Sequence, residues 1–561
     1  MLEKERSVER WVPGYRLIRS YDRAWLRPDV VSGLVLAAIL VPQGMAYAEL
    51  AGLPAVTGLY TTVACLVAYA VFGPSRVLVL GPDSSVSPLI LAAITPLLVT
   101  HDPNTAIALA GMLALLVGLI EIALGVCHLG FVADLLASEV QVGYMNGLAV
   151  TIIVGQLPKL FGFSTDASGF WNELKAFFEH IDQTEAAALL VGLGVLATLL
   201  VLPRVVPRLP AVLIAVVAAT AVSAAFDLAA NGVKTVGTLP SGLPSPSFPW
   251  TSLHDVGPLF LAAIGITMVS LTDTIATASA FAARRGDEVE PNQEMIGIGT
   301  ANIAAGFFQG FAISTSSSRT AVAEQSGAKS QVAGVVGAGI VVLLLLFFNS
   351  LLKDLPQSAL AAVVIAAALS LVNLRALRYY ARARRSALVL SLVATLGVIA
   401  LGVLEGIAVA IALAVLLFFR RNWWPHGEVL GHVEGEGWHS VAAYPDAAEL
   451  PGIVVYRWEA PLFFANARSF REQIRRLVRE RSPAWVVIQC EAITDVDVTA
   501  AETVADLDEE LNAQGVHVAM AEMRSRLQTL VQSYGLFESI HHDRFFPTVE
   551  LAVDAIREEQ S

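Results

Sequence analysis

Two short polar stretches lie between long apolar segments of the chain. The first is "LGPDSSVSPLI" at residues 80–90, and the second is "AISTSSSRTAV" at residues 312–322, where Arg319 follows a run of hydroxyl side chains. Glycine, proline and serine disfavour helix at the start of each stretch, so we expect an extended segment that turns into a short helix. Helix starts present free N–H groups and a positive dipole end. Two such starts with one arginine predict an anion-binding site.

The alternative is that the serines form a helix–helix contact, with Arg319 snorkelling or paired to a carboxylate. The matching position of the first stretch, roughly 230 residues earlier, favours the anion site. Polar, irregular backbone at membrane depth is tolerated only where it lines a cavity or is buried by protein.

Asp273 is a second charged group within a predicted membrane span, after Arg319. A carboxylate at the bilayer centre costs about 2.5–3.5 kcal/mol on insertion scales, so it indicates either a coupling site for a cation or proton, or a neutral pairing with Arg319. Gln43 occupies the corresponding depth roughly 230 residues earlier. Glu121, near the cytosolic end of its span, is a further candidate carboxylate.

Composition places these groups in a membrane protein. Of 561 residues, 55% are hydrophobic and 15% are charged, and the mean hydropathy is +0.64, whereas a soluble chain carries about a quarter charged residues. Residues 1–29 are basic and aromatic and lack the apolar core of a signal peptide, so they predict a cytosolic leader. Three widely spaced cysteines suggest neither a disulfide framework nor a zinc site.

Apolar runs predict about fourteen spans between residues 30 and 425. The expected spans are 30–49, 53–73, 83–99, 103–126, 138–158, 184–203, 209–227, 258–282, 292–311, 315–326, 331–352, 358–373, 386–402 and 404–420. Basic residues cluster before the first span and after the even-numbered spans, including the run from Arg375 to Arg385. The positive-inside rule then places both termini in the cytosol of a cell whose cytoplasmic membrane holds the protein.

The two polar stretches open the third and the tenth spans, so they fall at matching places in two halves of seven spans. An odd number of spans per half inverts the second half relative to the first. Inverted repeats with interrupted helices at matching positions are typical of secondary transporters, whose binding site lies near the midplane.

The chain changes character after the last span. Residues 426–449 are rich in glycine and predict a linker, and residues 450–561 alternate strand and helix patterns, which predicts a small α/β domain. From His426 onward there are 11 basic and 23 acidic residues, so the tail carries almost all of the net charge of −13. That acidity argues against a nucleic acid partner.

Long motifs are similar to those of the sulfate permease (SulP) family of anion transporters. "LPAVTGLYTTVACLVAYAVFGPSRVLVLGPDSSVS" at 53–87 resembles its signature, "VPQGMAYAELAG" resembles its first span, and "EPNQEMIGIGTANIAAGFFQGF" followed by "SSSRTAV" resembles its ninth and tenth spans. The tail resembles the family's STAS domain. The resemblance covers nearly the whole chain.

The resemblance implies a seven-plus-seven inverted repeat with a core domain (spans 1–4 and 8–11), a gate domain (spans 5–7 and 12–14) and a homodimer. It places the anion between helices three and ten. The residues implied to surround the anion are Gln43, Tyr47, Ser84, Ser85, Thr315, Ser316, Ser317, Ser318 and Arg319.

Asp273 and Thr277 match positions that resemble the sodium site of bicarbonate-transporting members. This chain has "STSSS" where those members have a small Gly/Ala-rich turn, so proton coupling is at least as well supported as sodium coupling. In the tail, the loop "TDVDVTA" places Thr499 at the position resembling a phosphorylated hydroxyl of bacterial antagonists. Alternatively, Asp497 or Thr499 only caps the following helix.

Three functions from different classes compete. The favoured one is a secondary transporter of a small anion, with sulfate first and sodium-coupled bicarbonate or proton-coupled C4-dicarboxylate as alternatives. An uncoupled anion channel or exchanger would not need Asp273. An enzyme or ATP-driven pump is disfavoured because no nucleophile–base pair, metal cluster or P-loop is visible, and no cofactor is implied.

Overall fold

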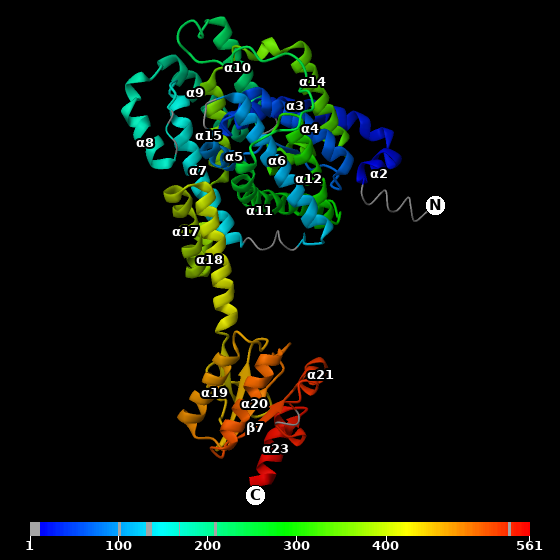
Figure 1. Ribbon diagram of the computed structural model, residues 1–561, viewed down its shortest axis with the longest axis vertical. Coiled ribbons are helices and arrows are strands. Elements are labelled where there is room, and N and C mark those ends of the chain that lie inside the picture. Colours follow the sequence, from blue (N-terminus) through cyan, green and yellow to red (C-terminus); the bar gives the residue numbers. More distant parts are fainter. Residues whose placement is uncertain are drawn as a thin grey trace. The chain divides into compact units, whose positions relative to one another are not determined.

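The computed structural model forms two compact units, Met1–Ala414 and Val415–Ser561 (Figure 1). It describes residues 12–98, 102–130, 137–165, 167, 169–206, 210–536 and 540–560. Most of the expected leader therefore lies outside the described residues. The first unit is helical except for two very short strands, and the second contains a mixed sheet covered by helices.

Every span expected from the sequence contains a helix. These helices are α3 (Leu26–Leu50), α4 (Ala55–Phe72), α5 (Ser87–Ile94), α6 (Pro103–Val126), α7 (Ser138–Leu160), α9 (Ala186–Val205), α10 (Ala211–Ala225), α11 (Leu253–Ala283), α12 (Pro291–Phe307), α13 (Ser317–Gln325), α14 (Val332–Phe347), α15 (Gln357–Leu371), α17 (Arg385–Leu401) and α18 (Val403–Trp423). Within the described chain, seven helical stretches are long and apolar enough to cross a membrane, and several shorter apolar helices accompany them. The expected helical membrane fold is confirmed.

The two polar stretches meet at an antiparallel strand pair. Strand β1 (Leu80–Gly81) pairs with β2 (Ser314–Thr315), and the backbone N–H of Ser316 extends the pairing by donating to the carbonyl of Val79, 3.3 Å away. Short helix α5 follows β1, and short helix α13 follows β2. As expected, each polar stretch runs extended and then turns into a short helix, and the antiparallel pairing is what an inverted repeat requires.

Helices α6 and α12 pack closely against each other. A Cβ built on Gly118 would lie 2.5 Å from the carbonyl oxygen of Gly299, and one built on Gly299 would lie 2.7 Å from that of Gly118. Gly111 and Gly306 face each other similarly farther along the two helices. The backbones approach this closely only because side chains are missing on both helices.

Three shorter helices were not among the expected spans: α2 (Pro13–Ser20), α8 (Phe170–Glu179) and α16 (Leu374–Ala383). Each is amphipathic and too short to cross a bilayer. Helix α16 lies between α15 and α17 and contains three of the five arginines in the basic run at 375–385.

The second unit contains a six-stranded sheet in the order β4-β3-β5-β6-β7-β8. Strands β5 (Ile453–Trp458), β6 (Trp485–Gln489), β7 (His517–Ala521) and β8 (Phe545–Phe546) run parallel, which confirms the expected α/β class. Val486 and Ile488 pack on one face with α19 (Ala467–Arg481), α20 (Val498–Asn512) and α21 (Ser525–Ser533). Trp485 and Val487 pack on the other face, against α23 (Val549–Gln560).

The structure differs from the sequence prediction at 426–449, which is not a linker. This segment contributes β3 (Gly427–Val433) and β4 (Gly437–Ser440), and β3 pairs antiparallel with both β4 and β5. The glycines that suggested flexibility have local roles. Gly435 and Gly437 adopt positive φ angles in the hairpin turn, and a side chain on Gly427 would collide with the hydroxyl of Tyr456.

Candidate anion-binding site

Arg319 is the charged centre of the candidate site. It lies in the first turn of α13, is 1% exposed, and donates from Nη1 to the carbonyl oxygen of Pro82, 2.6 Å away. The arginine thus links α13 to the segment between β1 and α5. Its Nε and Nη2 atoms are buried and have no hydrogen-bond partner among the described residues. Burying a donor without a partner is costly, so these two groups indicate a place for an acceptor.

Asp83 is a site residue that sequence reasoning missed. Its Oδ1 lies 3.7 Å from Nη2 of Arg319, while its Oδ2 accepts from both the backbone N–H and the hydroxyl of Ser85, each at 2.9 Å. At 3.7 Å the ion pair is too long for a hydrogen bond, so the Nη2 donor stays available. The structure therefore pairs Arg319 with Asp83 and not with Asp273, the partner that the sequence had suggested as an alternative.

Helix α3 contributes Gln43 and Tyr47, which lie one turn apart on the same face. Tyr47 is 4% exposed, and Asp83, Arg319 and Ser84 are its electrostatic neighbours. Helix α3 contacts both short helices. The structure therefore places Tyr47, Ser84 and Ser85 beside Arg319, as expected, and Gln43 is half-buried one turn away.

The start of α13 presents the remaining hydroxyl groups. Ser316 is the N-cap, and its Oγ accepts from the N–H of Arg319 at 3.5 Å and lies 3.0 Å from Oγ of Ser318. Ser317 and Ser318 are exposed, whereas Thr315 is buried and its hydroxyl has no hydrogen-bond partner in the described chain. The start of α13 therefore keeps exposed hydroxyl groups, whereas the Asp83 carboxylate binds Ser85 just before α5 begins.

Asp273 lies near this cluster and also contacts a different helix. Its Oδ1 accepts from Nε2 of Gln141 in α7 at 3.1 Å, and Asp83 and Ser85 are its electrostatic neighbours. Thr277, one turn later on α11, lies 2.7 Å from the hydroxyl of Ser317. The two predicted coupling residues are thus brought to the two short-helix starts, as the sequence led us to expect.

Glu121 belongs to a hydrogen-bond network that reaches the backbone just before β2. It is fully buried in α6, and its Oε2 accepts from Nδ2 of Asn302 at 2.8 Å. The Oδ1 of Asn302 in turn accepts from the N–H of Ile313 at 2.8 Å, directly before β2. Ser270 also donates to the carbonyl of Ile313. This network connects α6, α11 and α12 to the strand pair.

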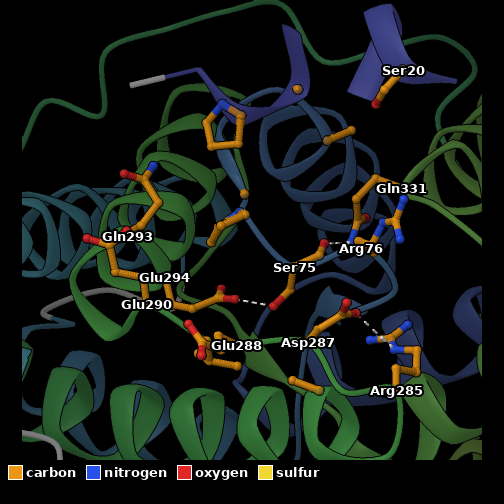
Figure 2. A pocket seen from close by; sticks show the side chains of 17 residues that line it. Ser20, Ser75, Arg76, Arg285, Asp287, Glu288, Glu290, Gln293, Glu294 and Gln331 are labelled. Atoms are coloured by element: carbon orange, nitrogen blue, oxygen red, sulfur yellow. Dashed lines mark hydrogen bonds and ion pairs between the residues drawn. The ribbon is translucent and has the colours of Figure 1, made fainter. Parts of the chain in front are cut away.

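A separate cavity of about 720 Å³ lies where α2 meets the loops that follow α4 and α11. It is lined by Pro13, Gly14, Ser20, Ala70, Gly73, Pro74, Ser75, Arg76, Ala282, Arg285, Asp287, Glu288, Val289, Glu290, Gln293, Glu294 and Gln331. Figure 2 shows Glu294 directed toward Ser75, whose hydroxyl donates to it, and Tyr69 also donates to Glu294 at 2.6 Å. None of the predicted anion-site residues lines this cavity.

In the tail, Asp497 is the cap of α20: its Oδ1 accepts from the N–H of Ala500 at 2.8 Å, and its Oδ2 accepts from that of Phe464 at 2.8 Å. The side chain of Thr499 is exposed in the first turn. The capping alternative therefore holds for Asp497, and the hydroxyl of Thr499 remains accessible.

Comparison with known proteins identifies the fold. The family model described as the sulfate permease family matches residues 26–395, and the model of the STAS domain matches residues 444–552. The chain belongs to the sulfate permease family. The predicted family and the predicted C-terminal STAS domain are both confirmed, and the family consists of transporters rather than enzymes.

A curated relative agrees with this assignment, and solved structures share the fold. A probable sulfate transporter of Mycobacterium tuberculosis is 42% identical over 551 residues, covering 98% of each chain. The fold is shared with murine Solute Carrier 26 family member A9, an anion transporter solved in the inward-facing state, with a TM-score of 0.89, 24% identity, and coverage of 98% of this chain and 94% of that one. The transmembrane domain of the cyanobacterial bicarbonate transporter BicA covers 70% of this chain and 98% of its own, with a TM-score of 0.61 and 22% identity.

Proposed function

We propose that this sulfate permease family member is a secondary transporter that moves sulfate across the cytoplasmic membrane, coupled to a proton. The carrying observation is the Arg319 guanidinium, which is buried with two unused donors at the start of α13. Sulfate is the favoured substrate because the 42% identical relative is described as a probable sulfate transporter. An oxyanion with several oxygens would accept from Arg319 and from the serine hydroxyls of the same turn.

The proposal assigns the anion to Arg319, Ser317 and Ser318, with Tyr47 and Gln43 closing the site from α3. Its second ion is a proton held by Asp273, because that carboxylate lies beside Asp83 and close to the short-helix starts. An arriving anion and an ionised carboxylate repel each other, and protonation removes the repulsion. Proton and anion then strengthen each other's binding by the same factor. Sodium at Asp273 and Thr277 is the competing coupling ion.

Movement in this proposal is an elevator-like sliding of a core domain (spans 1–4 and 8–11) against a gate domain (spans 5–7 and 12–14). Among the described residues, two side-chain contacts join these groups of helices. Asp273 in α11 accepts from Gln141, and Glu49 in α3 pairs with Lys159 at 3.3 Å, and both partners belong to α7. Sliding would exchange these contacts. The proposal includes a homodimer with cytosolic termini and leaves Thr499 as an accessible candidate for phosphorylation.

The test is uptake of radiolabelled sulfate into proteoliposomes at fixed internal pH, with external pH and sodium varied separately. Asp273→Asn mimics the protonated acid, so we expect retained sulfate binding and loss of the acceleration by an inward proton gradient. Glu405→Gln is the matched control, since it removes an exposed carboxylate from a different membrane helix, α18. A wild-type response of Asp273→Asn to both gradients would refute the coupling role.

The same vesicles test the substrate. Unlabelled sulfate should compete at lower concentration than bicarbonate or C4-dicarboxylates. Stronger competition by either of those two anions would refute the assignment of sulfate as the substrate. Flux that does not depend on a proton or sodium gradient in the wild-type protein would identify an uncoupled channel or exchanger.

A further inference from the structure

Helix α16 carries a basic stripe that the transport proposal does not use. Arg375, Arg378 and Arg382 follow each other at spacings of three and four residues, so they share one face of this ten-residue helix. Leu377 and Tyr380 lie on the opposite face and are half-buried. The helix is therefore strongly amphipathic, with one cationic side and one apolar side.

The cationic side has no partner within the described chain. All five arginines from Arg375 to Arg385 are exposed, and none makes an ion pair or a side-chain hydrogen bond with another described residue. The sequence contains no acidic residue between positions 357 and 404. Local acidic side chains therefore do not neutralise the stripe.

The position of α16 is fixed by its neighbours. It is separated from α15 by a non-helical Asn373 and from α17 by an extended Arg384, and both α15 and α17 are apolar membrane helices. Asn373 anchors the break, because its N–H donates to Asn146 of α7 at 2.8 Å and its Oδ1 caps α16 by accepting from Ala376 at 3.0 Å. A helix held between two membrane helices, and itself too polar to cross, belongs at a membrane surface.

We propose that α16 lies in the plane of the membrane surface and binds anionic phospholipid headgroups through Arg375, Arg378 and Arg382. Guanidinium groups bind phosphate oxygens in a bidentate manner. The exposed apolar side chains support a lipid partner, since Leu374 is 53% and Tyr379 is 67% exposed, and tyrosine favours the membrane–water interface. The acidic tail of the same chain would also match the charge, so the second test includes it as the competing occupant.

The first test compares two triple variants of the full chain. Arg375→Gln/Arg378→Gln/Arg382→Gln removes the stripe, and Arg468→Gln/Arg476→Gln/Arg479→Gln removes the same charge from exposed positions of α19 in the tail. Native mass spectrometry counts phosphatidylglycerol retained after extraction from vesicles with and without this lipid. We expect about a fivefold loss of affinity per arginine removed from α16 at low salt, and no loss in the α19 variant. Equal retention by both variants would overturn the proposal.

The second test keeps the arginines and reads the position of the helix. Tyr379→Cys in a Cys127→Ser background carries a spin label, because Cys127 is exposed whereas Cys65 and Cys490 are buried. We expect the label to lie at headgroup depth, and deeper when phosphatidylglycerol is present. A label in bulk water in both kinds of vesicle contradicts the proposal. So does a label immobilised only while residues 426–561 are present, because that result assigns the stripe to the acidic tail.

Discussion

Arg319 and Asp83 hold opposite charges at 3.7 Å inside a membrane protein, and neither satisfies the other completely. Breaking a buried pair by removing one partner leaves an uncompensated charge, which costs more than the pair itself contributes. A single substitution at either residue therefore changes folding and ligand binding together. Experiments on this site must separate the two effects.

Arg319→Ala is expected to weaken anion binding by about 10- to 150-fold, because a hydrogen bond to a charged group contributes about 1.5–3 kcal/mol. Calorimetry on purified protein measures the affinity. Arg76→Ala is the control, since Arg76 stacks on Trp25 with its guanidinium 5.0 Å from the ring centre, away from the site. The double variant Arg319→Gln/Asp83→Asn removes both charges, so it should fold well and still bind poorly. Unchanged affinity in that double variant would remove Arg319 from the site.

Residue types near the site were predictable, but their pairing was not. Hydroxyl runs and Arg319 at membrane depth indicated anion chemistry directly, because such groups are expensive there. Asp83 stood in the same quoted stretch as Ser84, yet an aspartate just before a helix is typical of an N-cap. Its ion pair depends on the crossing of two segments more than 230 residues apart, which no local pattern records.

At the scale of elements, α6 and α12 pack against each other and are joined to the strand pair by a hydrogen-bond network. Glu121 and Asn302 connect the backbone before β2 to both of these helices. The glycines at the α6–α12 contact set how closely the helices approach. Hydropathy predicted the residue ranges of these helices, because it depends only on consecutive residues. Their close backbone contact could not be predicted in this way, because it depends on which helices are neighbours in the fold.

Gly118→Ala should destabilise the membrane unit, because the added methyl group would meet the carbonyl oxygen of Gly299 at 2.5 Å. Overpacking of this kind costs about 1–3 kcal/mol. Thermal unfolding in detergent, followed by size-exclusion chromatography, measures the change. Gly339→Ala in α14 makes the same substitution where a Cβ meets nothing within 4 Å, so its midpoint should not fall. Equal midpoints for the two variants would show that this helix contact adapts freely.

Strands β3 and β4 show where glycine misleads a sequence argument. "GEVLGHVEGEGWHS" alternates too irregularly to stand out as a hairpin, and its glycines resemble those of a flexible linker. In the fold, Leu430 of β3 is 1% exposed and packs with the apolar cluster beneath α23. The strand became recognisable only once β5 was available as its neighbour.

A tail fragment covering residues 425–561 is expected to be more stable than one covering residues 450–561. The shorter fragment loses β3 and β4, exposes the edge of β5, and removes the burial of Leu430, which alone contributes about 1.5–3 kcal/mol. Urea titrations followed by circular dichroism compare the two fragments. A shorter fragment that unfolds at the same urea concentration would mean that the hairpin is peripheral to the domain.

At the scale of the whole molecule, the two units differ in chemistry as well as in fold. The helical unit is nearly neutral, and the tail carries most of the negative charge. Each has its own hydrophobic clusters. Composition alone predicted this division, because the membrane unit and the acidic α/β unit differ in hydropathy and in net charge. The position of the boundary, in contrast, depended on the hairpin.

Truncation after residue 425 should leave anion affinity unchanged within about twofold, because α18 ends at Trp423 and every candidate anion-binding residue lies in the helical unit. Calorimetry on the truncated protein, checked for folding by size exclusion, measures this. A truncated protein that folds yet binds no anion would place part of the site, or its support, in the tail.

The bridge between β1 and β2 is made of main-chain atoms, since Leu80 pairs with Thr315 and Gly81 with Ser314. Hydrogen bonds of this kind survive most exchanges of side chain. In the proposed site, a mutation could therefore change the hydroxyl groups around Arg319 while the bridge between β1 and β2 stays in place. Substrate specificity in such a site could then change through a few side-chain substitutions, without any change in the backbone framework.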